Sequence, residues 1–149
     1  MIKITPSFTF HGQCSQAIEL YKKAFGAEVK FKLLYSDANP KDFQCKNESE
    51  KDFIFHAQIK IGNQIIILSD DSGGMLNDDE QGKTGKIFLQ NLLMGFSSDD
   101  ELKKAYEILS DGATIFVPMC KTTYASCYVF LVDKFGGRWE LISGHKEIE

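Results

Sequence analysis

The sequence predicts an α+β fold made of two modules of the same shape, each a strand, a helix and three further strands. Three observations support this prediction. Strand-like and helix-like apolar patterns follow one another in the same order twice along the chain. A Gly-rich, acidic stretch separates the two copies. The residues repeat as well, since "GAEVKF" after the first helical pattern matches "GATIFV" after the second.

The first module is predicted over residues 1–70. "SFTFH" is a short strand, "SQAIELYKKAF" has apolar side chains at helical spacing, and Gly26 suits the helix end because glycine tolerates positive φ. "AEVKFKLLYS" is a strand, and a polar loop follows over about residues 37–52. "FIFHAQIKI" alternates, and "GN" turns the chain into the return strand "QIIILSD". The alternation places Phe53, Phe55, Ala57, Ile59 and Ile61 on one face and Ile54, His56, Gln58 and Lys60 on the other.

Residues 71–86 are the predicted linker, and the second module covers residues 87–143. "KIFLQNLLMGF" is a strand, and "SSDDELKKAYEILS" is a helix with a serine cap and acids in its first turn. Gly112 ends that helix, "ATIFVPM" is a strand, and "SCYVFLVD" with "RWELIS" forms a hairpin across "KFGG". Each helix would cover one sheet face and leave the other to form a cup, within one domain over 1–149.

The composition narrows the class of protein. The chain has 149 residues with a net charge of −4, which argues against nucleic-acid binding because that function needs a basic surface. No apolar stretch approaches the ~18 residues of a membrane-spanning helix, so we expect no membrane association and a cytoplasmic protein. The four cysteines are scattered, which favours free thiols. Cys14 lies at a predicted helix start, and we expect it to be a small buried residue.

Three segments resemble a known family, the PhnB-like proteins of the vicinal oxygen chelate (glyoxalase/bleomycin resistance/dioxygenase) superfamily. They are "TPSFTFHGQCSQAIELYKKAFGAEV", "HAQIKIGNQIIILSD" and "FLVDKFGGRWELI". The resemblance covers most of the chain. It implies two βαβββ modules that form a cup-shaped mixed sheet, a small-molecule ligand in the cup and a homodimer. Relatives have been described as ubiquinone-pathway methyltransferases, but this sequence has no G-x-G-x-x-G turn for a nucleotide-like cofactor.

Metal-dependent members of that superfamily hold an ion with two side chains from each module. The resemblance places these four positions on Pro6, Gln58, a residue near Asn91, and Glu140. Proline cannot bind a metal ion, and the two amides are weak ligands, so we expect no metal and no cofactor. His56, on the same strand face as Gln58, would be needed beside Glu140 for a residual metal site.

The predicted ligand-binding residues are His56, Gln58, Asn91, Arg138, Glu140, Phe8 and Phe10. His56 and Glu140 are the catalytic candidates, but His56 fits a half-buried structural histidine equally well. Arg138 shares a strand face with Glu140 and either clamps a carboxylate or phosphate or pairs with Glu140. Phe8 and Phe10 are either core residues or the aromatic floor of the cup.

Three hypotheses of function remain open. The first is a metal-independent small-molecule-binding protein with no established reaction. The second is a divalent-metal-dependent lyase, isomerase or dioxygenase of the glyoxalase type, in which His56 and Glu140 hold the ion. The third is a resistance protein that sequesters a drug or metabolite. Whether the protein is an enzyme is not decided by the sequence.

Overall fold

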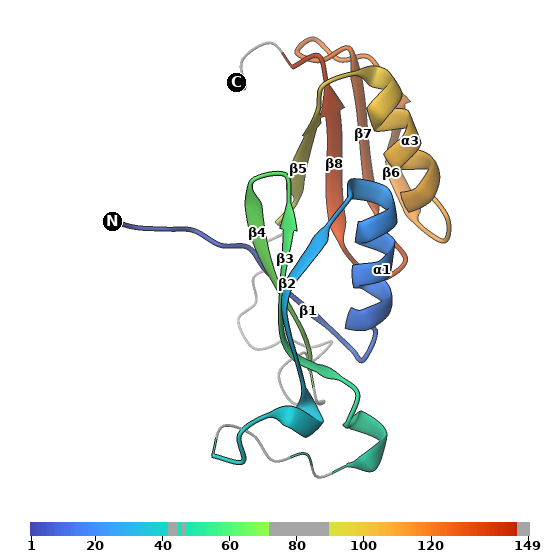
Figure 1. Cartoon of the computed structure of the whole chain (residues 1–149). Coiled ribbons are helices and arrows are strands. Elements are labelled where there is room, and N and C mark those ends of the chain that lie inside the picture. The colour runs from blue at the N-terminus through green and yellow to red at the C-terminus, as the bar shows by residue number, and fades with distance from the viewer. Residues whose placement is uncertain (42–44, 46, 72–89, 146–149) are drawn as a thin grey trace, which may run out of the picture. The chain divides into compact units, whose positions relative to one another are not determined.

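The computed structural model describes residues 1–41, 45, 47–71 and 90–145 of the chain. Contacts within the chain define two units, Met1–Ile87 and Phe88–Glu149. Each unit contains a four-stranded mixed sheet and a helix (Figure 1). The predicted α+β fold of two βαβββ modules is therefore confirmed, and the cup that the two modules would form together stays a prediction.

The first module has the strand order β1-β4-β3-β2, with β1 parallel to β4 and the other pairs antiparallel. Its helix α1 packs on β3 and β4. The buried side chains of α1 include Ala17, Ile18 and Tyr21, and those of the sheet include Ile59 and Leu68. The elements are β1 (Ser7–Phe10), α1 (Cys14–Phe25), β2 (Glu28–Leu34), β3 (Ile54–Ile61) and β4 (Gln64–Asp70).

The buried carboxylate of Asp70 ties the start of α1 to the sheet. The backbone N–H of Cys14 donates to Oδ1 at 3.0 Å, and that of Ile54 donates to Oδ2 at 2.9 Å. Gln13, at the helix N-cap, makes no capping bond with its side chain, so a strand residue satisfies this helix-start donor instead. Cys14 is fully buried, as predicted.

The second module repeats this arrangement, with the strand order β5-β8-β7-β6 and β5 parallel to β8. Its helix α3 packs on β8 and β5. The predicted serine cap is confirmed, because Ser98 Oγ accepts from Glu101 N at 3.2 Å. The elements are β5 (Leu92–Phe96), α3 (Asp99–Leu109), β6 (Thr114–Cys120), β7 (Cys127–Val132) and β8 (Arg138–Ser143).

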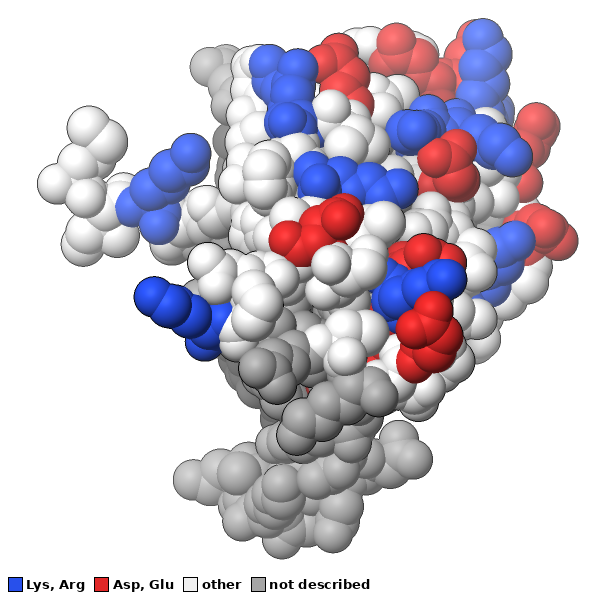
Figure 2. Space-filling view, turned by 60° about the horizontal axis from the view of Figure 1, so that its bottom comes forward, with Lys and Arg blue, Asp and Glu red and all other residues white. Residues whose placement is uncertain are grey.

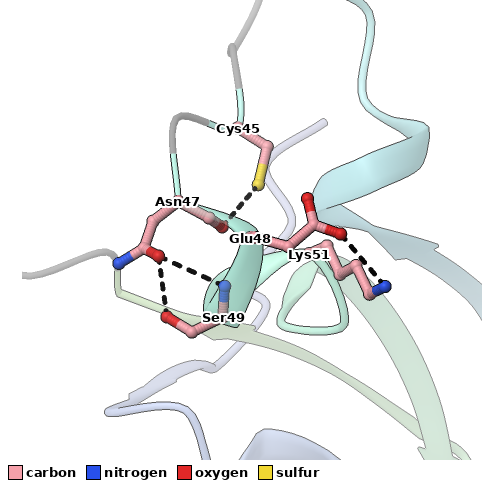
Figure 3. Close-up of polar contacts among 5 residues, drawn as sticks. All are labelled: Cys45, Asn47, Glu48, Ser49 and Lys51. Atoms are coloured by element: carbon pink, nitrogen blue, oxygen red, sulfur yellow. Dashed lines mark hydrogen bonds and ion pairs between the residues drawn. The ribbon is translucent and has the colours of Figure 1, made fainter.

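The polar segment between β2 and β3 contains two 3₁₀ helices that the sequence did not predict, η1 (Tyr35–Asp37) and η2 (Glu48–Glu50). The side chain of Asn47 caps η2 by accepting from Ser49 N at 3.2 Å and from Ser49 Oγ at 2.9 Å (Figure 3). Local bonds of this kind let short polar residues stabilise a turn where no core is available.

Two strand predictions need correction. The strand predicted over residues 86–96 is observed as β5 only from Leu92, and residues 86–89 lie outside the described residues. In β3 the predicted alternation holds from His56 onward, but Ile54 is fully buried although it was placed with His56. The pairing of β2 with β3 shifts between Leu33 and Leu34, and this irregularity breaks the alternation at the start of β3.

Charged side chains of both signs are interspersed on the molecular face drawn in Figure 2. Among the described residues visible there, Lys and Arg do not gather into the large basic patch that nucleic-acid binding requires. None of the helices in the described part of the chain is long and apolar enough to cross a membrane.

Candidate functional site

The second module has a sheet face that α3 does not cover, which we call the open face of the second module. Side-chain alternation along β8 places the half-buried Arg138 and Glu140 and the buried Ile142 on it, whereas Trp139 and Leu141 are fully buried on the α3 side. The register places Leu93 of β5 and Phe130 of β7 on either side of Glu140. Glu140 therefore lies in the middle of the sheet and between two apolar side chains.

Glu140 is hydrogen-bonded to a tyrosine. Tyr128 Oη donates to Glu140 Oε1 at 2.6 Å. Burial raises the pKa of the Tyr128 phenol, and the bond to Glu140 and the negative charge of that carboxylate raise it further. Tyr128 thus keeps its proton at neutral pH and acts as a donor, which leaves Glu140 as an acceptor.

Arg138 does not pair with Glu140, although the sequence suggested that pairing as one alternative. Its Nε donates to Asn91 Oδ1 at 2.9 Å. The guanidinium carbon lies 5.1 Å from the ring centroid of Phe130 and 6.0 Å from that of Phe116, within the range of cation–π contacts. An amide and two aromatic rings therefore hold the guanidinium in place.

A hollow of about 270 Å³ lies at the end of β5 and β8 in this module. Space is open beside Gly95, because a Cβ placed there would meet no atom within 4 Å. The size is close to the lower limit of about 300 Å³ for small-molecule pockets. The lining residues are Leu93, Gly95, Phe96, Ile142, Ser143 and His145.

The first module brings together its two predicted polar residues on the sheet face opposite α1. Gln58 Nε2 lies 3.4 Å from His56 Nε2, and the His56 ring lies 5.9 Å from that of Phe31, centroid to centroid. Both polar side chains are half-buried. His56 therefore has a neutral amide beside it, and no carboxylate among the described residues is bonded to its ring.

Phe8 and Phe10 lie on the opposite face from His56 and Gln58. Phe8 pairs with Leu68, which also pairs with Ala57, and both of these partners are fully buried on the α1 side. Phe10 is buried as well. The core alternative for these two phenylalanines is therefore favoured over the floor of the cup.

The position that the resemblance placed on Pro6 also needs correction. Ser7 pairs with Ile67 and Ile67 with Gln58, so the β1 residue that shares the face of Gln58 is Ser7. In the second module, the β5 residue opposite Glu140 is Leu93, two residues after Asn91. Register sets these positions, and the sequence did not show the register of the two parallel pairs.

Comparisons with known proteins address the fold. No family model matches the chain. It is 27% identical over 145 residues to protein YjdN of Escherichia coli (strain K12), covering 91% of each chain. The structure of a putative 3-demethylubiquinone-9 3-methyltransferase, PhnB protein, from Bacillus cereus superposes with a TM-score of 0.72 at 19% identity, covering 95% of this chain and 99% of that one.

A glyoxylase/bleomycin resistance protein/dioxygenase domain from Frankia sp. EAN1pec is also similar, with a TM-score of 0.67, 13% identity and coverage of 99% and 96%. The chain has the glyoxalase/bleomycin resistance fold. The same fold occurs in the fosfomycin resistance protein FosX of Listeria monocytogenes, whose mutant was solved with Mn(II) and a dihydroxypropylphosphonic acid. That structure has a TM-score of 0.61 and 11% identity over 99% and 96% of the two chains.

In this chain, the residues at the positions that bind metal in vicinal oxygen chelate proteins are poorly suited to hold a metal ion. Glu140 has Leu93 and Phe130 as its neighbours in register, one oxygen is bonded to Tyr128, and the cationic Arg138 occupies the Asn91 oxygen. Divalent ions need several convergent anionic or imidazole ligands. Among the described residues, no three His, Cys, Asp or Glu side chains form such a group.

Sequence reasoning missed Tyr128 and the two aromatic neighbours of Arg138. The hairpin itself contained the signal, because the "KFGG" turn pairs Phe130 with Glu140 and Val132 with Arg138. Alternation then puts Tyr128 on the same face as Phe130. Phe116 had no comparable signal, since the β6–β7 pairing contains register shifts.

Proposed function

We propose that this protein binds a small organic molecule on the open face of the second module and on the matching sheet face of the first module, opposite α1, and does so without a resident metal ion. These are the two open faces. The observation that carries the proposal is the bond from Tyr128 to Glu140. The bond occupies one oxygen of the carboxylate expected at a metal position, and the other oxygen can accept a hydrogen bond from a ligand. The aromatic and apolar side chains around it supply the contact area that a small ligand needs.

The metal part of the proposal is tested by titrating Mn²⁺ into isotope-labelled protein that was purified without chelators. Paramagnetic broadening should spread over exposed carboxylates and should not concentrate on His56 and Glu140. Stoichiometric binding that disappears in both His56→Gln and Glu140→Gln variants would contradict the proposal and favour the metal-dependent enzyme. Joint ligation by these two residues would require each to lie about 2 Å from the ion.

The ligand part is tested by a fragment screen read by chemical shifts. Perturbations should fall on open-face residues such as Leu93, Phe130 and His56 and spare α1 and α3. Fragments that perturb only the helices would contradict the proposal. Turnover of a bound compound would identify an enzyme, whereas binding without turnover would favour a sequestering protein. Light scattering during gel filtration tests the expected homodimer.

A further inference from the structure

We propose that the open face of the second module binds a small aromatic oxyanion that also carries a hydrogen-bond donor. Arg138 holds the oxyanion and Glu140 accepts from the donor. The inference rests on the small-molecule binding proposed above and adds the chemical class of the ligand.

Arg138 is the only arginine in the chain, and the other sixteen of the 17 basic residues are lysines. A lysine could not replace arginine at this position, because the guanidinium both bonds Asn91 and lies over Phe130 and Phe116. With Nε engaged, its two terminal nitrogens make no hydrogen bond or ion pair to any other described residue. These coplanar donors match the two oxygens of a carboxylate or phosphonate.

Glu140 supplies the second polar contact. Its Oε1 accepts from Tyr128, and its Oε2 has no partner within the described residues. Arg138 and Glu140 are two residues apart on one strand face, so their backbone positions are about 7 Å apart. A carboxylate can only accept and repels a second anion, so the ligand must present a hydroxyl or ammonium group to Glu140 and its oxyanion to Arg138.

The side chains around these two polar ends are apolar. Phe130 pairs with Glu140 and also lies beneath the guanidinium of Arg138. Leu93 is 43% exposed and Phe116 is 57% exposed, so both offer apolar surface to a ligand beside Glu140 and Arg138. An aromatic ring that links the oxyanion to the donor would cover this surface, with its face or edge on Phe130.

The test uses the Nε–Hε signal of the single arginine in a ¹H–¹⁵N spectrum of the whole chain. The probes are 4-hydroxyphenylacetate and its counterpart 4-hydroxybenzylphosphonate, compared with phenylacetate, which lacks the donor, and 4-hydroxybenzyl alcohol, which lacks the anion. Both hydroxylated anions should shift the Arg138 signal saturably, and phenylacetate should bind about fivefold more weakly because one hydrogen bond is lost. Inorganic phosphate should give no saturable shift.

Variants separate charge from geometry. Arg138→Lys keeps the charge but loses the donor fork, and it should weaken binding of 4-hydroxyphenylacetate about tenfold or more. Glu140→Gln should reduce the advantage of 4-hydroxyphenylacetate over phenylacetate. Lys103→Gln removes one charge from an exposed position on α3 and should change neither. Trp139 is the single tryptophan and is fully buried, so its fluorescence reports whether each variant is folded.

The outcomes distinguish this inference from the function on which it rests. If 4-hydroxybenzyl alcohol shifts open-face residues as strongly as the anions do, or if the anions bind without moving the Arg138 signal, the oxyanion proposal is wrong and small-molecule binding stands. If phosphate alone moves the signal equally, Arg138 is a general anion contact and the proposal is also wrong. Failure of all four probes would contradict the oxyanion proposal, and failure of the fragment screen as well would contradict both proposals.

Discussion

Trp139 and Asp133 are joined by a buried hydrogen bond across the closing hairpin of the second module. Trp139 Nε1 donates to Asp133 Oδ2 at 2.8 Å, and the tryptophan is fully buried. Asp133 Oδ1 accepts from the backbone N–H groups of Phe135 at 2.8 Å and Gly137 at 3.0 Å. One carboxylate therefore shapes the turn and holds the largest core side chain on the α3 side of β8. Arg138 and Glu140 face the open side as a result.

Replacing Asp133 with alanine should destabilise the protein by about 3 to 5 kcal/mol, because three donors lose a charged acceptor and the bonds of two of them, Gly137 N and Trp139 Nε1, are buried. Urea unfolding followed by circular dichroism measures the change. Asp111→Ala is the matched control, since Asp111 is exposed and its contact with Lys134 is long at 3.8 Å. The control should cost less than about 1 kcal/mol. Equal losses in the two variants would show that the turn does not depend on Asp133.

The bond from Tyr128 to Glu140 predicts a loss of stability in alkali. The folded protein raises the pKa of the Tyr128 phenol through burial and through Glu140. Above the ordinary tyrosine value of about 10, the unfolded chain loses this proton while the folded chain keeps it, so the free energy of unfolding falls as pH rises. Tyr128→Phe should flatten that fall, and Glu140→Gln should flatten it in part. Tyr106→Phe, on α3, is the control, and an equal effect there would count against the assignment.

The four thiols should differ in reactivity toward N-ethylmaleimide at neutral pH. Burial raises the pKa of Cys14, with a further contribution from the charge of Asp70, and burial also raises the pKa of Cys127. Cys120 is exposed. Mass spectrometry should therefore find Cys120 labelled first and Cys14 and Cys127 unlabelled until urea is added. Rapid labelling of Cys14 in the folded protein would show that α1 does not stay docked on its sheet.

The sequence sufficed for the order of the α-helices and strands and for the buried side of β8, because alternation and the "KFGG" turn are local signals. It did not suffice for the partners of the site residues. Arg138 bonds Asn91, which is 47 residues earlier and directly precedes the parallel neighbour β5, and no local pattern reports a parallel pairing. The same cause explains why the sequence placed on Pro6 the position that the strand register gives to Ser7. Phe8 and Phe10 mark one face of β1 as core, but this alone does not show which β1 residue lies beside Gln58. The pairing of Ser7 with Ile67, and of Ile67 with Gln58, identifies that residue as Ser7.

Two glycines that end secondary-structure elements should respond differently to alanine. Gly26, after α1, has φ 67° and Gly144, after β8, has φ 61°, so both variants lose about 1 kcal/mol or more to the left-handed backbone. At Gly26 a Cβ would meet nothing within 4 Å, whereas at Gly144 it would lie 2.3 Å from Ser126 Oγ. That hydroxyl donates to Asp99 Oδ1 at 2.7 Å, at the start of α3, so it cannot move without breaking the bond. Gly144→Ala should therefore lower the urea midpoint more than Gly26→Ala does. Adding Ser126→Gly should recover part of the difference, and equal midpoints for the two single variants would show that the Ser126 contact relaxes freely.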